Sequence, residues 1–362
     1  MMTRQMAIIS IGVLAIGATL HCGSTRRQPR PLETPFPPHP VGAQLYEKYC
    51  ALCHGESGEG YLADEATALA SQDFLVAASD SFIADNTGRG RPGTPMSAWG
   101  REYGGALDPQ DAAMVVSHLR SWQTESSINT SKLWKAGRAD KGSEIYAREC
   151  ETCHGYEGKG ARYMTLNNAV FQETATDGFI GFTVEQGRRK TKMPRFGNKL
   201  RRRQIQDLIA YLRSIPKDTT FSRLFSAQEG DASWEKPAEI LFPQNPPAVF
   251  NLRDNRFVKA AEVYKAYQKQ QSFLLIDARP HSDYLLSHIE GAVSIPFYDV
   301  ENRLDEIPKD RWVITYCGCP HAISGKALDT LRAHGYQKSG LLDEGFYVWG
   351  EMGYPINKNR EP

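Results

Sequence analysis

The chain has no excess of charge of either sign and no hydrophobic run long enough to span a bilayer comfortably. Its 362 residues carry 43 Lys and Arg against 42 Asp and Glu, a formal net charge of +1, so there is no general electrostatic attraction for nucleic acid. The mean hydropathy of −0.48 indicates a water-soluble body. The length exceeds that of one typical domain and predicts two or three.

Cysteine is also scarce, with 7 residues in the chain, and four of them stand in two copies of the pattern Cys-x-x-Cys-His. The copies consist of Cys50, Cys53 and His54, and of Cys150, Cys153 and His154. This pattern is typical of c-type haem attachment, in which the thiols add to the haem vinyl groups and the adjacent His reaches the iron. A zinc knuckle or a thioredoxin-like redox pair is the alternative interpretation.

The two copies belong to a repeat of domain size. YEKYCALCHGESGEG starts at position 46 and YARECETCHGYEGKG at position 146, which predicts two folded copies. Each copy later has a Met on a Pro-rich loop, Met96 in the first and Met193 in the second. A loop thioether is the usual sixth iron ligand of cytochromes c. Met114 and Met164 are weaker candidates, and core packing is the alternative for a loop Met.

Helical segments open and close each copy. The closing helix of the first copy begins after Asp108, a strong start signal because Asp caps helices and a Pro follows. The segments SHLRS and AYLRS of the two closing helices align His118 with Tyr211. We expect these rings to pack opposite small glycines of the opening helices, Gly42 and Gly142. Iron ligation by His118 is the alternative.

With these motifs, residues 41–124 and 137–216 resemble two class I cytochrome c domains. The resemblance implies two all-α domains and two covalently bound haem c groups. The haems would be attached through Cys50, Cys53, Cys150 and Cys153, and their irons would be bound by His54, Met96, His154 and Met193.

The N-terminus has the features of an export signal. A basic start precedes the apolar run 6–20, which fits the core of a signal peptide better than a bilayer span. We predict that residues 1–22 are a signal peptide or lipoprotein anchor ending in Cys22, and that 23–40 are a Pro-rich tether. The alternative is an uncleaved membrane anchor. In both cases the protein would be exported to the bacterial periplasm and held at the membrane by its N-terminus.

A different pattern follows the linker predicted at residues 217–247. The apolar runs 273–277 and 312–317 are predicted to be buried strands between helical stretches, which implies a parallel sheet. LLIDARPHSDYLLSHIEGAVSIP and LLDEGFYVWGEMGYPI carry the opening and closing motifs of rhodanese domains, and residues 248–358 resemble that family. The predicted fold is therefore multidomain, with two all-α cytochrome c domains followed by an α/β rhodanese domain that has a central parallel sheet.

The resemblance places the sulfur-transfer nucleophile at Cys317, which would hold a sulfane sulfur as a persulfide. The loop lacks the Gly and the Arg or Lys usual in the family, and it contains Cys319 and His321, which could supply positive charge when protonated. Arg279 could hold the loop or an anion, or form a structural ion pair, and His288 is predicted to be structural. A regulatory thiol pair and a binding-only module are the alternatives to a competent persulfide site.

Together these features predict a dihaem electron-transfer protein coupled to persulfide chemistry on a sulfane-sulfur compound. Sulfurtransferase or sulfur-compound oxidoreductase activity would depend on Cys317. The alternative is an electron shuttle whose rhodanese domain docks a partner or senses redox state. A dihaem peroxidase is disfavoured by the two Met ligands.

The predicted partner is a periplasmic or membrane redox carrier, and nucleic acid is not expected. An acidic carrier would be attracted by basic residues near the second Met loop, with a solvated basic face as the alternative. These residues are Arg188, Arg189, Lys190, Lys192, Arg195, Lys199, Arg201, Arg202 and Arg203.

Overall fold

The computed structural model describes residues 39–60, 66–91, 94–130, 134, 137–160, 163–189, 191–219, 237–318 and 321–358. The predicted export signal with Cys22, the tether up to residue 38, residues 220–236 of the linker and Cys319 lie outside the described residues. All described residues belong to one compact unit, 32–362.

The first helical domain begins with α1 (Pro40–Tyr49), which leads into the one-turn helix α2 (Ala51–His54). The elements α3 (Gln72–Leu75), α4 (Asp80–Arg89), the 3-10 helix η1 (Arg101–Tyr103) and α5 (Pro109–Ser121) follow. Helix α5 starts where the sequence predicts, because Asp108 Oδ1 accepts hydrogen bonds from the amides of Gln110 and Asp111.

The second helical domain repeats this order. Helix α6 (Ala139–Glu149) leads into the one-turn helix α7 (Glu151–His154). The elements η3 (Tyr156–Gly158), α8 (Ala169–Thr174), α9 (Asp177–Gln186), η4 (Phe196–Asn198) and α10 (Arg202–Ser214) follow.

The repeat extends to single hydrogen bonds. Arg120 on α5 donates from Nε to Asp80 at the start of α4, at 2.7 Å. Arg213 on α10 donates from Nε to Asp177 at the start of α9, at 2.8 Å. The internal repeat predicted from the two Cys-x-x-Cys-His motifs is therefore present in the tertiary structure.

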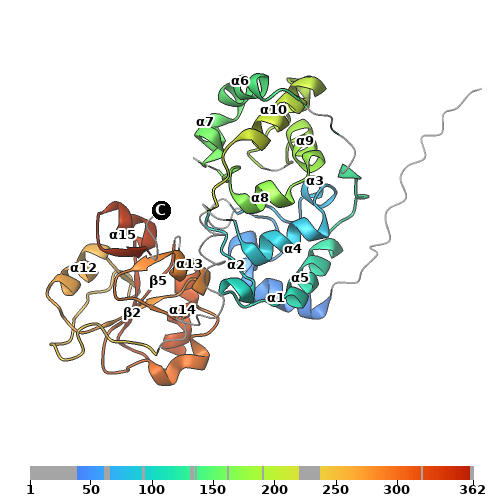
Figure 1. Cartoon of the computed structure of the whole chain (residues 1–362). Coiled ribbons are helices and arrows are strands. Elements are labelled where there is room, and N and C mark those ends of the chain that lie inside the picture. The colour runs from blue at the N-terminus through green and yellow to red at the C-terminus, as the bar shows by residue number, and fades with distance from the viewer. Residues whose placement is uncertain are drawn as a thin grey trace, which may run out of the picture. The chain divides into compact units, whose positions relative to one another are not determined.

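In each helical domain the opening and closing helices approach closely at a glycine. Helix α1 contacts α5, and α6 contacts α10; Figure 1 shows the latter pair near the top of the view. A Cβ atom on Gly42 would lie 2.0 Å from the carbonyl oxygen of Met114. A Cβ atom on Gly142 would lie 2.0 Å from the carbonyl oxygen of Asp207. Neither helix pair could be this close with a larger residue.

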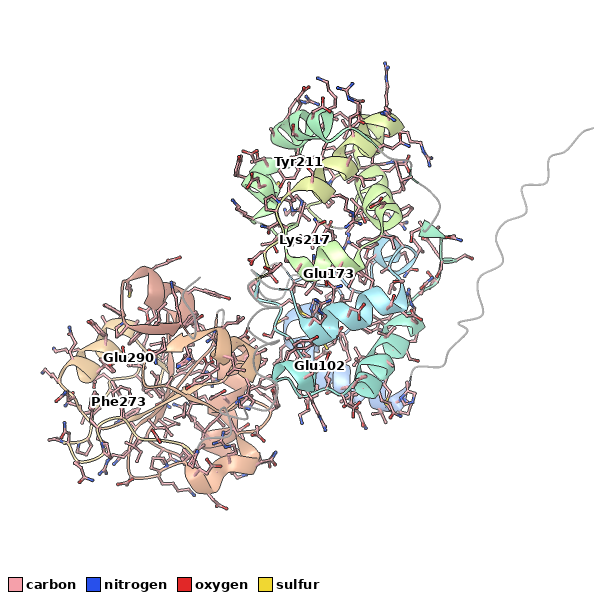
Figure 2. All side chains as sticks on the ribbon, in the orientation of Figure 1. Glu102, Glu173, Tyr211, Lys217, Phe273 and Glu290 are labelled. Carbon is pink, nitrogen blue, oxygen red and sulfur yellow. The ribbon has the colours of Figure 1, made fainter. Side chains whose placement is uncertain are left out.

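The rings aligned in the sequence lie beside these glycines. The His118 ring is 5.4 Å from the Tyr46 ring and 4.8 Å from the Trp122 ring. Tyr211, which is labelled on α10 in Figure 2, lies 5.2 Å from the ring of Tyr146. These contacts confirm the packing role predicted for His118.

The C-terminal domain contains the predicted central parallel sheet, which has five strands. Its strands are β1 (Phe257–Val258), β2 (Leu274–Asp277), β4 (Val293–Ser294), β5 (Val313–Tyr316) and β6 (Ser339–Leu342), in the order β1-β6-β5-β2-β4. Helices α12 (Ala260–Gln268), α13 (His281–Leu286), α14 (Ala322–Ala333) and α15 (Gly345–Glu351) surround the sheet (Figure 1). The 3-10 helix η5 (Glu301–Glu306) and an antiparallel pair, β3 (Ser287–Ile289) with β7 (Ile356–Lys358), complete the domain.

The position of Cys317 follows from the sheet. Every residue of β2 and β5 is buried, as expected for central strands covered on both faces. Phe273, labelled in Figure 2, precedes β2 and is fully buried. Because β5 ends at Tyr316, Cys317 lies at the carboxyl end of the parallel sheet, where α/β domains place their sites.

Candidate functional site

The first Cys-x-x-Cys-His segment is folded as a single helical turn. Cys50 ends α1 and caps α2, and Cys53 and His54 lie on α2. His54 Nδ1 lies 2.8 Å from the carbonyl oxygen of Thr67. Since a carbonyl only accepts, Nδ1 carries the proton, and Nε2 keeps its lone pair for a metal ion.

The second segment is built in the same way. Cys150 caps α7, on which Cys153 and His154 lie. His154 Nδ1 lies 3.0 Å from the carbonyl oxygen of Met164, so Met164 orients the imidazole through its main chain. Cys150 and Met193 both pack on the apolar core that the helical domains share.

The electrostatics of Cys50 and Cys150 do not favour a thiol redox pair. Burial raises the pKa of Cys50 and of Cys150 to about 12 each. A thioredoxin-like pair needs the opposite, a cysteine with a lowered pKa that is a thiolate at neutral pH.

The two Met loops have the same hydrogen bonds. The amide of Arg91 donates to the carbonyl oxygen of Met96 at 2.9 Å, and Thr94 Oγ1 accepts from the amide of Met96 at 3.2 Å. The equivalent residues of the second loop make the same two bonds, both at 3.1 Å. Each loop follows a glycine with φ of 65° (Gly90) or 66° (Gly187), a conformation that favours glycine.

Cys50, Cys53, His54 and Met96 line one cavity of about 590 Å³, within the size range of cofactor sites. Two thiols, an imidazole nitrogen with a free lone pair and a thioether are therefore gathered in one largely apolar space. This donor set fits a covalently attached haem.

The candidate nucleophile is buried at the start of the loop before α14. Cys317 is 3% exposed, and its Sγ lies 3.0 Å from Ser324 Oγ. Burial raises the pKa of the Cys317 thiol. The hydroxyl and amide of Ser324, the amide of His321 and the charge of Arg279 act against this shift. The site therefore contains groups that would stabilise a thiolate or a persulfide anion.

Arg279 lies in a buried ion pair. Its Nη2 is 2.6 Å from Asp277 Oδ2, and its Nε is 2.9 Å from Asp277 Oδ1. It also donates to the carbonyl oxygen of Ser287 at 2.7 Å and lies over the ring of Phe346. Burial opposes the charge of Arg279, but Asp277 outweighs burial and raises the pKa of this guanidinium. These contacts are those of the structural ion pair that was one alternative for Arg279. The positive charge of Arg279 also favours the thiolate of Cys317.

The two histidines of this domain differ in setting. His288 Nδ1 lies 2.8 Å from the carbonyl oxygen of Tyr284, and the two rings stack at 3.7 Å. His321 precedes α14 with a φ of 77°, and its ring packs against Phe257 at 5.3 Å. Burial lowers the pKa of His321, although Asp343 opposes the shift. Protonation of His321 is therefore less favourable than for an exposed histidine.

The predicted basic cluster does not form one uniform surface. Arg188 lines the cavity beside His54. Arg189 pairs with Asp73 at 2.9 Å, and Lys199 pairs with Glu149 at 2.5 Å. Part of its positive charge is therefore balanced by neighbouring carboxylates.

The α/β domain contacts the first helical domain beside the Met96 loop. Ser97 Oγ donates to Asp283 Oδ2 at 2.6 Å, and Ser282 Oγ donates to the carbonyl oxygen of Ala98 at 3.1 Å. Helix α14 contacts α2, and Ile323 in its first turn lines the cavity beside His54. Helix α14, which follows the loop that begins at Cys317, therefore touches the first Cys-x-x-Cys-His turn.

Sequence reasoning missed three features of these sites. The first is Ser324 as the partner of Cys317, and the second is the Ser97–Asp283 contact. The third is Arg91, whose Nε and Nη2 are buried and find no hydrogen-bond partner among the described residues. Only Arg91 had a detectable signal, because it and Arg188 precede Met96 and Met193 by the same number of residues.

These domains and sites define a class of protein, tandem c-type cytochrome domains joined to a rhodanese-like domain. Family models match accordingly: Cytochrome c at residues 41–123, Cytochrome C oxidase, cbb3-type, subunit III at 137–212, and Rhodanese-like domain at 259–352. The chain therefore contains tandem cytochrome c domains and a C-terminal rhodanese-like domain, and the cytochrome c domains imply covalently bound haem c.

Individual relatives resemble separate parts of the chain. The cbb3-type cytochrome c oxidase subunit FixP of Azorhizobium caulinodans is 28% identical over 180 residues, 48% of this chain and 58% of that protein. A sulfurtransferase of Allochromatium vinosum is 34% identical over 86 residues, 24% of this chain and 79% of that protein. The HTH-type transcriptional regulator Rv0324 of Mycobacterium tuberculosis is 30% identical over 84 residues, 23% of this chain and 37% of that protein. The chain thus spans less than two thirds of the oxidase subunit and of the regulator.

Within the part of the chain that the structure describes, none of the helices combines the length and the apolar character needed to cross a bilayer.

Proposed function

We propose that this protein is a dihaem electron-transfer protein in which sulfur bound at Cys317 supplies electrons to the haems. The observation that carries the proposal is the contact between helices α14 and α2. Helix α14 follows the loop that begins at Cys317, and α2 bears His54. Ile323 of α14 lines the same cavity as His54. A short path between the sulfur site and the first haem site is what electron transfer would require.

The first haem would be attached to Cys50 and Cys53 and bound by His54 and Met96. The second would be attached to Cys150 and Cys153 and bound by His154 and Met193. The support for two haems is the repetition of the same imidazole–carbonyl hydrogen bond and the same Met loop in both helical domains.

The sulfur chemistry would begin with the thiolate of Cys317 attacking the outer sulfur of a sulfane donor RSS⁻. A bond forms between this sulfur and Cys317, the S–S bond of the donor breaks, and RS⁻ leaves. No electrons are lost overall in this step. Ser324 and the loop amides would hold the resulting anion.

An oxidation would follow when the persulfide sulfur joins a thiolate RS⁻. One new S–S bond forms, and two electrons are released. Haem groups held at the two Cys-x-x-Cys-His sites would supply this capacity, one electron each. The role of the protein is to keep Cys317 close to the first haem and to exclude water from the anion, since this thiol is only 3% exposed.

The test is addition of a sulfane donor to the oxidised full-length protein without oxygen, with haem absorbance and protein mass followed in the same sample. We expect both haems to be reduced while sulfur is added to Cys317. Cys317→Ser should keep both haems and show no donor-dependent reduction. A persulfide on Cys317 with haems that stay oxidised would contradict the coupling.

A second candidate is an electron shuttle whose rhodanese domain docks a partner or senses redox state. The burial of Cys317 and its raised pKa favour this alternative, because a thiolate is needed for sulfur transfer. It predicts no added sulfur on Cys317 and, for a sensor, a disulfide between Cys317 and Cys319.

We further propose that the chain is exported to the periplasm and held at the membrane through Cys22 or an uncleaved N-terminal segment. Its electrons would pass to a periplasmic or membrane redox carrier, and the basic residues near the second Met loop would favour an acidic one. This part of the proposal is supported by the apolar run 6–20 and by the need to attach haem c outside the cytoplasm.

A further inference from the structure

Two half-buried arginines lie between the helical domains. Arg91 precedes Met96 and Arg188 precedes Met193, at equivalent positions of the repeat. Both line the cavity that contains His54 and Met96, although Arg188 belongs to the second domain. The amide of Arg188 donates to the carbonyl oxygen of Met193, and the guanidinium of Arg91 packs on Phe171 of the second domain. Each arginine is therefore close to both candidate haem sites.

The contacts of the two arginines are reciprocal. The guanidinium of Arg91 lies 5.2 Å from the ring centre of Phe171 in the second domain. The guanidinium of Arg188 lies 5.2 Å from the ring centre of Phe74 in the first domain. Phe74 and Phe171 occupy equivalent positions in α3 and α8. Such an exchange is expected when two similar domains are related by an approximate two-fold axis.

Among the residues that the structure describes, no carboxylate forms an ion pair with Arg91. Its Nε and Nη2 are buried and have no hydrogen-bond partner in the described part of the chain. A guanidinium whose nitrogens are buried without partners is costly unless an anion is bound beside it. Guanidinium groups are well suited to carboxylates, which they bind through two parallel hydrogen bonds.

We propose that Arg91 and Arg188 form one shared binding site for the propionate carboxylates of both haems. This inference rests on the dihaem assignment made above. The arrangement makes each arginine an electrostatic partner of both haems and not only of the haem in its own domain. A cation near a haem favours the reduced iron, which carries less positive charge.

The test is a redox titration of the full-length dihaem protein with Arg91→Gln and, separately, Arg188→Gln. We expect each substitution to move both midpoint potentials to lower values. Arg101→Gln, which removes an exposed arginine, should leave both potentials unchanged. A shift of only one potential would show that the site is not shared, and the absence of any shift would show that no carboxylate is bound there.

The variants Arg91→Lys and Arg188→Lys are controls for loss of the haem or of the fold. They keep the charge, so we expect two haems by mass and potentials closer to those of the wild type than in the Gln variants. Loss of a haem in the Gln variants but not in the Lys variants supports the proposal. Loss of a haem in both types of variant would overturn it, since charge would not be the cause. The mass of the wild-type protein gives the number of haems before any variant is measured. Failure of the dihaem assignment is therefore distinguished from failure of the shared arginine site.

Discussion

The reactivity of Cys317 depends on two opposing influences. Burial disfavours the thiolate, whereas Ser324 and the loop amides favour it. Because a folded-state pKa above the ordinary value leaves the thiol protonated at neutral pH, the rate of nucleophilic attack should rise with pH up to that pKa. Small changes around Cys317 therefore have large effects on the amount of reactive thiolate.

Ser324→Ala should move the alkylation profile of Cys317 to higher pH. The hydroxyl lowers the pKa of the thiol, and a hydrogen bond to a charged group contributes about 1.5–3 kcal/mol. We expect the rate of alkylation at neutral pH to fall by about ten- to a hundredfold, because one pKa unit corresponds to about 1.4 kcal/mol. The measurement is mass spectrometry of the Cys317 peptide after timed alkylation at several pH values.

Ser324→Thr keeps the hydroxyl and serves as the matched control. Its profile should remain close to that of the wild type. An unchanged profile in Ser324→Ala would mean that Ser324 accepts a hydrogen bond from the thiol and does not stabilise the thiolate.

The helix pairs of the two cytochrome c domains depend on close backbone contact. Helices α1 and α5 approach at Gly42, and α6 and α10 approach at Gly142. A change in the distance between the helices of a pair would also affect the Cys-x-x-Cys-His turns that follow α1 and α6.

Gly42→Ala should destabilise the first cytochrome c domain. The added Cβ would lie 2.0 Å from the carbonyl oxygen of Met114, and forced overpacking costs about 1–3 kcal/mol. Gly88→Ala on α4 is the control, since a Cβ there would meet no atom within 4 Å. It should stabilise the helix by up to about 1 kcal/mol. Thermal unfolding followed at the haem band should shift in opposite directions for the two variants, and a shared direction would contradict the packing argument.

The rhodanese domain is joined to the first cytochrome c domain at the loop that presents Met96. Burial raises the pKa of Asp283, and Arg279 and the hydrogen bond from Ser97 act against this shift. The hydrogen bond from Ser97 and the nearby charge of Arg279 therefore both favour the ionised form of Asp283. The hydrogen bond between Ser97 and Asp283 also holds Ser97, which follows the proposed iron ligand Met96.

Ser97→Ala should loosen this contact. A buried acceptor that loses its donor costs about 1–3 kcal/mol, so hydrogen exchange of the amides in 96–100 should become about five- to a hundredfold faster if they exchange through local opening. Asp283→Asn removes the charge from the same pair. The double variant should therefore cost less than the sum of the single variants, because the two residues are in direct contact. Additive effects would show that the contact contributes nothing.

Much of the fold could be predicted from the sequence because its signals are local. Cys50, Cys53 and His54 lie within one helical turn, and the helix start at Asp108 depends on neighbouring amides. The strand that leads to Cys317 is an uninterrupted apolar run. The fold class, the repeat and the packing of His118 opposite Gly42 were predicted correctly for this reason. The iron ligands and the role of Cys317 remain predictions.

The remaining features depend on residues that are distant in the chain and meet only in the folded protein. Arg91 reaches Phe171, and Ser97 reaches Asp283, and no sequence pattern links the members of either pair. The structure also placed Arg279 in an ion pair with Asp277, an alternative that spacing left open. Short-range chemistry is encoded in consecutive residues, whereas burial and the pairing of charges arise only when separate elements pack together.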